Sequence, residues 1–348
     1  MRVAHFTGLR KLEICEVAEP ELTRPEDVRV RIDRVGVCGS DVHYYTAGRI
    51  GQQIVRYPAT IGHECSGTVI EVGREVERLK VGDRVAIDPA LVCGECDQCR
   101  AGRSNTCRNI QFMGSPGQSP GAIADYHVLP AGNCLPIPES MTLDQAALIE
   151  PLSIGLYAVK MADVYPAARI AVLGSGPIGL SVLLAAKVAA PCTIYATDLV
   201  DERLAAARQC GADWTGNPRQ QDVVGEISER EPYGLDMVFE CSGDPACIEQ
   251  AMRLLTPGGV MFWIGIPPTV QVSFDAHLMR NKELTFRAVR RQKGCVAAAI
   301  RLVSDGFIDA DPLLTHRFPL DEIRDAFELA AGYGDGVIKA VIDLSSAS

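Results

Sequence analysis

The chain has 348 residues, 47% of them hydrophobic and 22% charged, which is enough apolar material for two domains with packed cores. Its net charge of −10, without a dense run of Lys or Arg, argues against nucleic acid or an anionic membrane as the main partner. The amino-terminal segment lacks the apolar stretch of a secretory signal, and glycines interrupt the most apolar region, so we expect a cytoplasmic protein with no membrane span.

The first 150 residues are predicted to form a β-rich domain. Residues 27–38, 64–73 and 81–87 alternate apolar and polar side chains, as strands with one buried face do. Glycine and proline separate these short runs, which is typical of a small barrel-like domain with long loops. A helix is expected at "SDVHYY", with Ser40 as a candidate N-terminal cap.

Side chains that commonly bind zinc lie in three separate segments. They are Cys38 in "GVCGSDVHYY", which also holds Ser40 and His43, then His63 and Glu64 in "GHECSG", and Glu150 in "LIEPLS". One thiolate, one imidazole and a carboxylate would make a three-ligand zinc site with a coordination position left open. Because the segments lie far apart in the chain, spacing alone does not establish that they converge.

Four of the thirteen cysteines lie within one short segment, at Cys93, Cys96, Cys99 and Cys107. The spacing C-x2-C-x2-C-x7-C, among glycine and polar residues, predicts a loop that binds a closed structural zinc ion. An iron–sulfur cluster and a set of free thiols are the alternatives. Most of the other cysteines are expected to be small buried residues, because an odd total without a secretory signal does not suggest disulfides.

From about residue 170, short apolar strands alternate with amphipathic helices, which predicts a parallel, doubly wound sheet. The strand "RIAVL" precedes G-x-G-x-x-G at Gly174, Gly176 and Gly179, and a helix follows from Pro177 and Ile178. Such glycines allow a tight turn, close approach of a pyrophosphate and close packing of the helix on the strand. The motif therefore predicts a dinucleotide-binding site.

Asp198 ends the next strand, about 20 residues after the glycines. A carboxylate there accepts hydrogen bonds from ribose hydroxyls and repels a 2′-phosphate, which favours NAD over NADP. Arg203 is expected either to flank the adenine or to be a solvated helix residue. The strand in "VMFWIGIP" is either an edge strand that pairs between subunits or a buried one. Residues 312–344 are expected to form a loop, a helix and a final strand that returns to the first domain.

Taken together, these motifs show that the sequence resembles the zinc-dependent medium-chain dehydrogenases. The shared features are G-H-E-x2-G-x5-G-x2-V at Gly62–Val76, the four-cysteine lobe and the placement of G-x-G-x-x-G. Within that family it is most similar to the polyol (sorbitol or L-iditol) dehydrogenases, through "VCGSDVHYY", "GRIG", "IVRYP", "LIEPLS" and "LTHRFPL". The resemblance implies an α/β protein with a GroES-like catalytic domain at 1–155 and 291–348 and a Rossmann coenzyme domain at 156–290.

The resemblance also implies two zinc ions per chain, one of them in the cysteine lobe. Cys38 and His63 would ligate the catalytic ion, and Glu64 and Glu150 would share the remaining protein coordination, directly or through water. Glu150 stands where the alcohol dehydrogenase branch uses a cysteine.

A proton relay is implied as well. Ser40 would take the proton from the alcohol, and His43 would pass it to solvent by way of the coenzyme ribose. Ser40 as a simple cap and His43 as a plain surface residue are the alternatives. Tyr44 either lines the substrate pocket or belongs to the core, and His127, which lies in no ligand pattern, is expected to be structural.

One segment departs from the polyol enzymes. Where they commonly carry Phe-Arg-Tyr, this chain has Arg290, Arg291 and Gln292. Arg291 fits the arginine that binds a substrate hydroxyl, but the lost aromatic ring and the added charge make an acidic or phosphorylated substrate conceivable.

The expected activity is reversible, NAD-linked oxidation of a secondary alcohol on a polyol such as sorbitol, iditol or xylitol to a ketose. A threonine dehydrogenase of the same family and an enzyme for an acidic sugar derivative are the near alternatives. A non-enzymatic NAD sensor is the distant one. A homo-oligomer, either a dimer or a tetramer, is expected from the resemblance.

Overall fold

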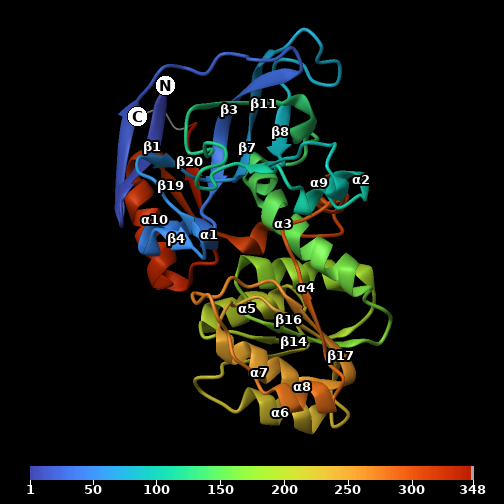
Figure 1. Ribbon diagram of the computed structural model, residues 1–348. Coiled ribbons are helices and arrows are strands. Elements are labelled where there is room, and N and C mark those ends of the chain that lie inside the picture. The colour runs from blue at the N-terminus through green and yellow to red at the C-terminus, as the bar shows by residue number, and fades with distance from the viewer. Residues whose placement is uncertain (346–348) are drawn as a thin grey trace. The chain divides into compact units, whose positions relative to one another are not determined.

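The computed structural model describes residues 1–345, which divide into two compact units (Figure 1). The first unit comprises Met1–Glu150, Val296–Gly306 and the carboxy-terminal segment from Leu314, and the second comprises Pro151–Cys295 and Phe307–Leu313. These junctions lie near the expected boundaries at 155/156 and 290/291. None of the helices in the described part of the chain is long and apolar enough to cross a membrane.

A seven-stranded sheet forms the frame of the first unit. The strands follow the order β12–β8–β7–β3–β20–β19, with β11 also paired to β3, and all neighbours are antiparallel except β19 and β20. Their bounds are Asp27–Gly36 (β3), Glu64–Val72 (β7), Arg84–Ile87 (β8), Tyr126–Pro130 (β11), Cys134–Pro136 (β12), Leu314–Pro319 (β19) and Lys339–Asp343 (β20). The last strand of the chain thus returns to the first unit, where it pairs with β3.

Among the described residues, shorter strands and five α-helices complete this unit. The strands are β1 Arg2–Gly8, β2 Lys11–Glu16 and β6 Ala59–Thr60 in one sheet, the pair β4 Arg49–Ile50 and β5 Gln53–Ile54, and the pair β9 Ala90–Leu91 and β10 Gln111–Phe112. The helices are α1 Gly39–Ala47, α2 Asp97–Arg100, α9 Val296–Ser304, α10 Ile323–Gly332 and the first part of α3 Leu143–Ala162.

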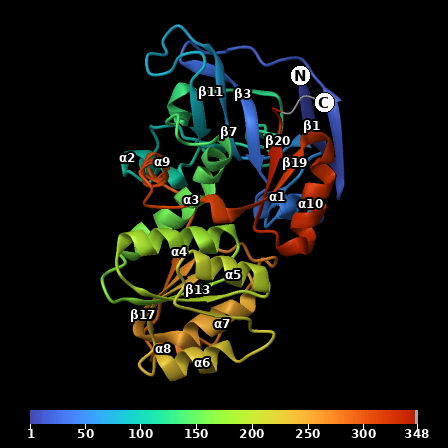
Figure 2. The same ribbon diagram turned by 180° about the vertical axis from the view of Figure 1, so that it is seen from behind.

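An aromatic cluster fixes α1 and α10 beside each other in the first unit (Figure 2). The rings of Phe6, Tyr45 and Phe327 are fully buried, with centroids 5.2 to 5.5 Å apart. Aromatic pairs at such distances stabilise a core beyond the area they bury. Because α1 follows β3, this packing sets the position of the residues at the junction between the strand and the helix.

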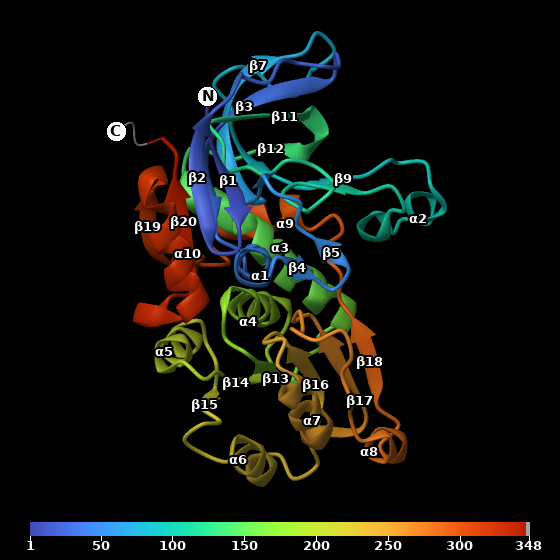
Figure 3. The ribbon, with the colours of Figure 1, turned by 60° about the vertical axis from the view of Figure 1, so that its left-hand side comes forward.

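The second unit is a six-stranded parallel sheet in the order β15–β14–β13–β16–β17–β18. The strands are β13 Arg169–Leu173, β14 Thr193–Thr197, β15 Trp214–Gly216, β16 Leu235–Glu240, β17 Leu255–Trp263 and β18 Thr285–Ala288. The helices are α4 Pro177–Ala189, α5 Asp201–Gln209, α6 Val223–Arg230, α7 Pro245–Leu254 and α8 Ala276–Asn281. Figure 3 shows α4 and α5 on one face of the sheet and α7 on the other. The predicted doubly wound sheet is therefore confirmed.

The structure decides between two alternatives for one strand of the second unit and corrects one predicted domain boundary. The strand in "VMFWIGIP" belongs to β17, which lies between β16 and β18, so it is interior and the described sheet ends at β18. Residues 307–313 belong to this unit and not to the carboxy-terminal part of the first, because Ile308 and Leu313 are buried and the short helix Asp311–Leu313 contacts α5.

His127 gives the first unit a pH-dependent stability. Burial on β11 lowers the pKa of His127 from 6.5 to about 4. The folded protein thus disfavours the protonated ring, and this stability is present above pH 6.5 and is lost as the pH falls toward 4. We expect wild type to lose about 2–3 kcal/mol more than His127→Gln over that interval. Urea unfolding at pH 7 and pH 4.5 tests this, and a pH-independent difference would contradict it.

Candidate metal and coenzyme sites

Three candidate ligands converge where β3 and β7 meet. The Sγ atom of Cys38, a ring nitrogen of His63 and a carboxylate oxygen of Glu64 lie within 4.8 Å of one another. Glu64 begins β7 and pairs with Gly36 at the end of β3, so two neighbouring strands deliver all three residues to one place. A Cβ at Gly36 would lie 2.4 Å from Glu64 Oε2, and glycine leaves that space to the carboxylate. The donor set fits zinc, which binds thiolate, imidazole and carboxylate ligands.

Lys339 of β20 is a partner of this cluster that sequence reasoning missed. Its side chain is 1% exposed, and its Nζ donates to Glu64 Oε1 at 2.7 Å and to the carbonyl of Val37 at 2.9 Å. Burial lowers the pKa of Lys339, but the charges of Glu64 and Cys38 outweigh burial, and the net shift is upward. A charged ammonium therefore balances the negative ligands from the side of the last strand.

Asp41 is a second residue that the sequence analysis did not identify, and its carboxylate lies behind the ring of His63. It is fully buried on α1, with Oδ1 3.5 Å from His63 Nδ1, and Oδ2 accepts the backbone N–H of Cys38 at 3.4 Å. Burial lowers the pKa of His63, but the charges of Asp41 and Cys38 raise it well above its usual value. A carboxylate behind a ligating histidine orients the ring and raises its basicity. That recurrent arrangement is the one signal that could have identified this residue.

Removing the charge behind His63 is expected to weaken metal binding. Asp41→Asn keeps the shape of the side chain, and we expect a loss of about 10–100-fold in zinc affinity at the cluster. Competition with a chelator, followed by zinc analysis, measures this. Asp33→Asn, a buried carboxylate that pairs with Arg31 elsewhere on β3, is the control and should leave zinc affinity unchanged. Equal affinity in Asp41→Asn and wild type would disprove the supporting role.

Glu150 lies close to the cluster without joining the set of atoms within 4.8 Å. It is buried in α3, directly before Pro151. Burial raises the pKa of Glu150 to about 7, while the neighbouring His63 and Lys339 charges lower it and Glu64 raises it. The carboxyl group is thus near enough to feel the charges of the cluster.

The expected relay residues follow Cys38 on α1. The Ser40 hydroxyl donates to Cys38 Sγ at 3.3 Å. The predicted cap role of Ser40 is wrong, because the helix begins at Gly39 and Cys38 is the N-cap residue. His43 is partly buried, and burial lowers its pKa, so the ring is neutral near pH 7. Tyr44 is 3% exposed, packs in the core and donates to Gln53 Oε1 at 3.2 Å, which favours its core alternative.

The four cysteines of the lobe form a second cluster. Their sulfur atoms lie within 4.8 Å of one another, with Cys93 and Cys107 3.5 Å apart and Cys96 and Cys107 3.9 Å apart. Four sulfurs at about 2.3 Å from one zinc would be separated by about 3.8 Å, so these distances fit a single tetrahedral ion. The backbone N–H groups of Arg108 and Cys99 lower the pKa of Cys96 to about 6, which favours a thiolate. The geometry fits zinc better than a polynuclear iron–sulfur cluster.

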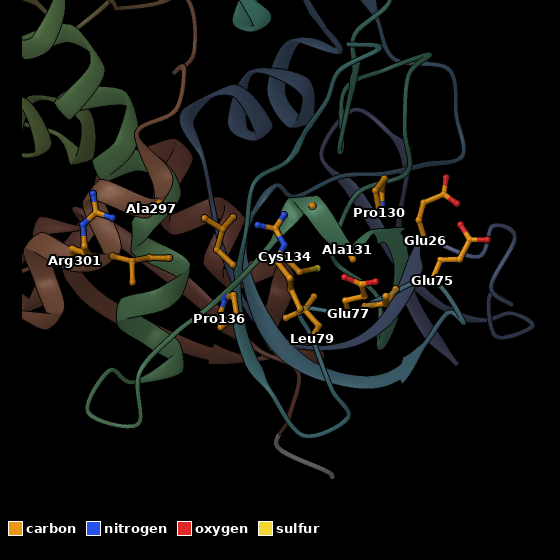
Figure 4. Close-up of a pocket in the computed structure, with 15 residues that line it drawn as sticks. Glu26, Glu75, Glu77, Leu79, Pro130, Ala131, Cys134, Pro136, Ala297 and Arg301 are labelled. Atoms are coloured by element: carbon orange, nitrogen blue, oxygen red, sulfur yellow. The ribbon is translucent and has the colours of Figure 1, made fainter.

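A cavity of about 710 Å³ in the first unit is separate from both clusters (Figure 4). Glu26, Glu75 and Glu77 lie on one side of it and Arg301 of α9 on the other. Its one thiol, Cys134, has a pKa that burial raises to about 12, so it is not a nucleophile at neutral pH. None of the candidate ligands lines this cavity.

The glycine motif has the geometry of a phosphate-binding turn. Gly174 has a φ of 93°, and a Cβ at Gly179 would lie 1.8 Å from the carbonyl oxygen of Gly174. Gly176 is the N-cap residue of α4, and no side chain caps this helix, so its first N–H groups remain for a ligand. Pro177 and Ile178 form the first turn of α4. The turn thus fits the pyrophosphate of a dinucleotide.

Asp198 follows β14 and lies against this turn. Its carboxylate accepts the N–H of Ser175 at 2.7 Å and that of Val200 at 2.9 Å. The Arg203 guanidinium is also close, with Nη1 3.4 Å from where a Cβ of Gly176 would be. The acid and the arginine therefore flank the phosphate-binding turn in the second unit.

Residues 290–292, where the sequence departs from the pattern Phe-Arg-Tyr of the polyol enzymes, lie after β18 in the second unit. Arg291 has a positive φ of 52°, which places its backbone in the left-handed region. Gln292 is 7% exposed and accepts the N–H of Cys295 at 2.9 Å, so it holds its own loop together.

The chain matches two described families and is similar to several dehydrogenases. Residues 24–139 match the alcohol dehydrogenase GroES-like domain, and residues 177–305 match the zinc-binding dehydrogenase family. The chain is 34% identical to the sorbitol dehydrogenase of Bacillus subtilis (98% of this chain, 97% of the relative) and 35% identical to the L-idonate 5-dehydrogenase of Vitis vinifera (98% and 94%). A solved Escherichia coli oxidoreductase/dehydrogenase of unknown specificity superposes with a TM-score of 0.94 at 31% identity, over 99% of both chains.

Proposed function

Because the chain belongs to the zinc-dependent medium-chain polyol dehydrogenase family, we propose that it reversibly oxidises a secondary alcohol of a polyol to a ketose with NAD. The reaction removes a hydride from the carbinol carbon and a proton from its hydroxyl, and the hydride reduces NAD to NADH. The observation that carries the proposal is the convergence of Cys38, His63 and Glu64 beside the buried Glu150.

In this proposal the first unit holds the metal and handles the proton. Cys38 and His63 would bind the catalytic zinc, and Glu150 would supply the further carboxylate, because Glu64 is already paired with Lys339. Zinc at this place would supply Lewis acidity, which lowers the pKa of an alcohol hydroxyl as it lowers that of water to about 7.

The proton route is the second part of the proposal. The Ser40 hydroxyl lies next to Cys38 Sγ, and it would accept the alcohol proton while it releases its own proton toward His43. His43, one helical turn further along α1, is neutral and accepts that proton for transfer to solvent.

The second unit binds the coenzyme. The uncapped start of α4 binds the pyrophosphate, and Asp198 accepts hydrogen bonds from the ribose, which selects NAD over NADP. Asp198→Asn removes the charge and keeps a hydrogen-bond acceptor for Ser175. We expect this change to lower the preference for NAD, as the ratio of kcat/KM values for NAD and NADP, by about 10–100-fold.

Steady-state kinetics with both coenzymes measure that ratio. Asp201→Asn is a matched control on the neighbouring helix, where the carboxylate accepts from Asn217 and Gln220, and it should not alter the ratio. An unchanged ratio in Asp198→Asn would contradict the selecting role of Asp198.

The proposed function is tested by NADH formation with zinc-replete protein and a panel of sorbitol, L-iditol and xylitol. L-threonine, L-idonate and simple alcohols complete the panel, and NADP is run in parallel. Turnover on a polyol with NAD supports the proposal. Activity on threonine alone, or NADH binding without any turnover, would refute it in favour of a threonine dehydrogenase or an NAD sensor.

An acidic sugar derivative is the second candidate substrate class. Two adjacent arginines, Arg290 and Arg291, replace a Phe-Arg pair of the polyol enzymes, and a relative from Vitis vinifera is an L-idonate 5-dehydrogenase. A second guanidinium favours a carboxylate or phosphate on the substrate. Higher kcat/KM for L-idonate than for every polyol would establish this alternative.

A further inference from the structure

Glu240 is a buried carboxylate that the proposed chemistry leaves without a role. It is the last residue of β16 and is fully buried. Its Oε1 atom accepts three hydrogen bonds, from Ser242 N at 2.8 Å, Ser242 Oγ at 2.6 Å and Gly243 N at 2.8 Å. Its backbone carbonyl accepts the N–H groups of Ile264 at 2.9 Å and Gly265 at 3.0 Å. The carboxylate therefore closes the turn after β16, while the backbone carbonyl of the same residue, which does not depend on the side chain, joins that turn to the turn after β17.

These two turns are packed backbone to backbone. A Cβ at Gly265 would lie 2.2 Å from the N atom of Gly243 and 2.5 Å from Glu240 Oε2, and a Cβ at Gly243 would lie 2.4 Å from the carbonyl oxygen of Ile266. Neither turn tolerates a larger residue at these glycines. The two turns therefore form one packed body, against which the carboxyl group of Glu240 lies.

The same body forms a wall of the phosphate-binding turn. A Cβ at Gly174 would lie 2.9 Å from the N atom of Ser242, and the N–H of Cys241 donates to the carbonyl of Leu173 at 2.8 Å. The strands β13 and β16 are neighbours on opposite sides of the point where the strand order reverses. Dinucleotides bind at the carboxyl ends of the strands at such a point.

We propose that Glu240 is a positioning residue for the coenzyme: its carboxylate fixes the turn after β16, at Ser242 and Gly243, against the glycine turn, so that the binding edge exists before the coenzyme arrives. This inference rests on the proposed dinucleotide binding. A preformed edge lowers the ordering that the coenzyme must impose, and so raises its affinity.

A purely structural role would not require this residue type. Burying a carboxyl group is unfavourable, and burial raises the pKa of Glu240 despite its hydrogen bonds. Glu231, which precedes the same strand, serves as a structural comparison. Its carboxylate accepts the Tyr195 hydroxyl at 2.7 Å and lies 3.6 Å from Arg169, with no contact to the glycine turn among the hydrogen bonds and ion pairs of the described residues.

The test is direct titration of the full-length, zinc-replete protein with NADH, followed by fluorescence. Glu240→Ala frees three donors, and we expect NADH to bind about 20-fold more weakly. Glu240→Gln keeps an amide oxygen for the same donors and should bind NADH within about threefold of wild type. Glu231→Ala should bind NADH within about twofold of wild type, even where its thermal stability falls as far as that of Glu240→Ala.

Turnover separates positioning from general damage. In Glu240→Ala the KM for NAD should rise by about the same factor as the NADH dissociation constant, with kcat kept at saturating NAD. If Glu240→Ala does not fold, Ser242→Ala replaces it, because it removes the hydroxyl that donates to Oε1, and NADH should bind about threefold more weakly.

The failures of the two proposals are distinguishable. Wild type that binds neither NADH nor NADPH would overturn the proposed function and this inference with it. If wild type binds NADH and Glu240→Ala binds it with equal affinity, only the inference about Glu240 is overturned. If Glu231→Ala weakened NADH binding as much as Glu240→Ala does, the inference would also be overturned, because the effect would then be general.

Discussion

Cys38→Ser is expected to lower dehydrogenase activity by at least about 10³-fold, because the Lewis acid that it would remove contributes several kcal/mol to the reaction. Serine is nearly the same size as cysteine but is a far weaker zinc ligand. The lobe cysteines remain intact, so we expect the zinc content to fall from two ions per chain to one. NADH binding should persist, because the coenzyme motif lies in the second unit.

Activity, zinc analysis and NADH titration on the same preparation measure these three outcomes together. Cys15→Ser, on β2 and outside both clusters, is the control and should keep two zinc ions and full activity. His63→Ala should reproduce the result of Cys38→Ser. Turnover at the wild-type level in Cys38→Ser would remove the basis of the metal assignment.

Lys339→Met is expected to lower the stability of the first unit strongly. Methionine is similar in length to lysine but carries no charge. The change therefore removes the buried ammonium and leaves the Glu64 carboxylate, itself 1% exposed, without its cation. Breaking a buried ion pair from one side destabilises proteins by about 3–5 kcal/mol, because the remaining charge stays buried without compensation. We expect a loss of that size in the free energy of unfolding of the first unit.

The double variant Lys339→Met with Glu64→Gln provides the decisive comparison. Removing both charges should recover most of the stability that the single variant loses, since the uncompensated charge is then absent. Urea unfolding of the four proteins in the cycle gives the coupling energy. A single variant as stable as wild type, or a double variant less stable than Lys339→Met, would contradict the ion-pair account.

The local motifs were predictable because their chemistry lies within a few residues. The four lobe cysteines occupy one short segment, and the spacing of Gly174, Gly176 and Gly179 reports the turn directly. The doubly wound sheet follows from the alternation of strands and helices. Convergence of Cys38 with His63 needed the family resemblance, because only the pairing of β3 with β7 brings them together.

The support of the cluster was not predictable in the same way. Lys339 contacts Glu64 across 275 positions of sequence, and in "VIKAVIDL" it looks like a solvated strand residue. Its burial depends on the placement of β20 between β3 and β19, which no local pattern reports. Asp41 was overlooked because Ser40 seemed sufficient to begin the helix, whereas Cys38 itself occupies the N-cap position.

The position of Lys339 in the last strand has a consequence for synthesis of the protein. The ribosome synthesises the chain from its amino terminus, so Glu64 is made long before Lys339, whose ammonium balances the charge of Glu64. The second unit, whose last segment is Phe307–Leu313, is complete before Lys339 is made. The metal cluster therefore gains its counter-charge only when β20, one of the last segments to be made, joins β3. A premature stop just before Lys339 would leave every candidate metal ligand in the product and still deprive the cluster of its counter-charge.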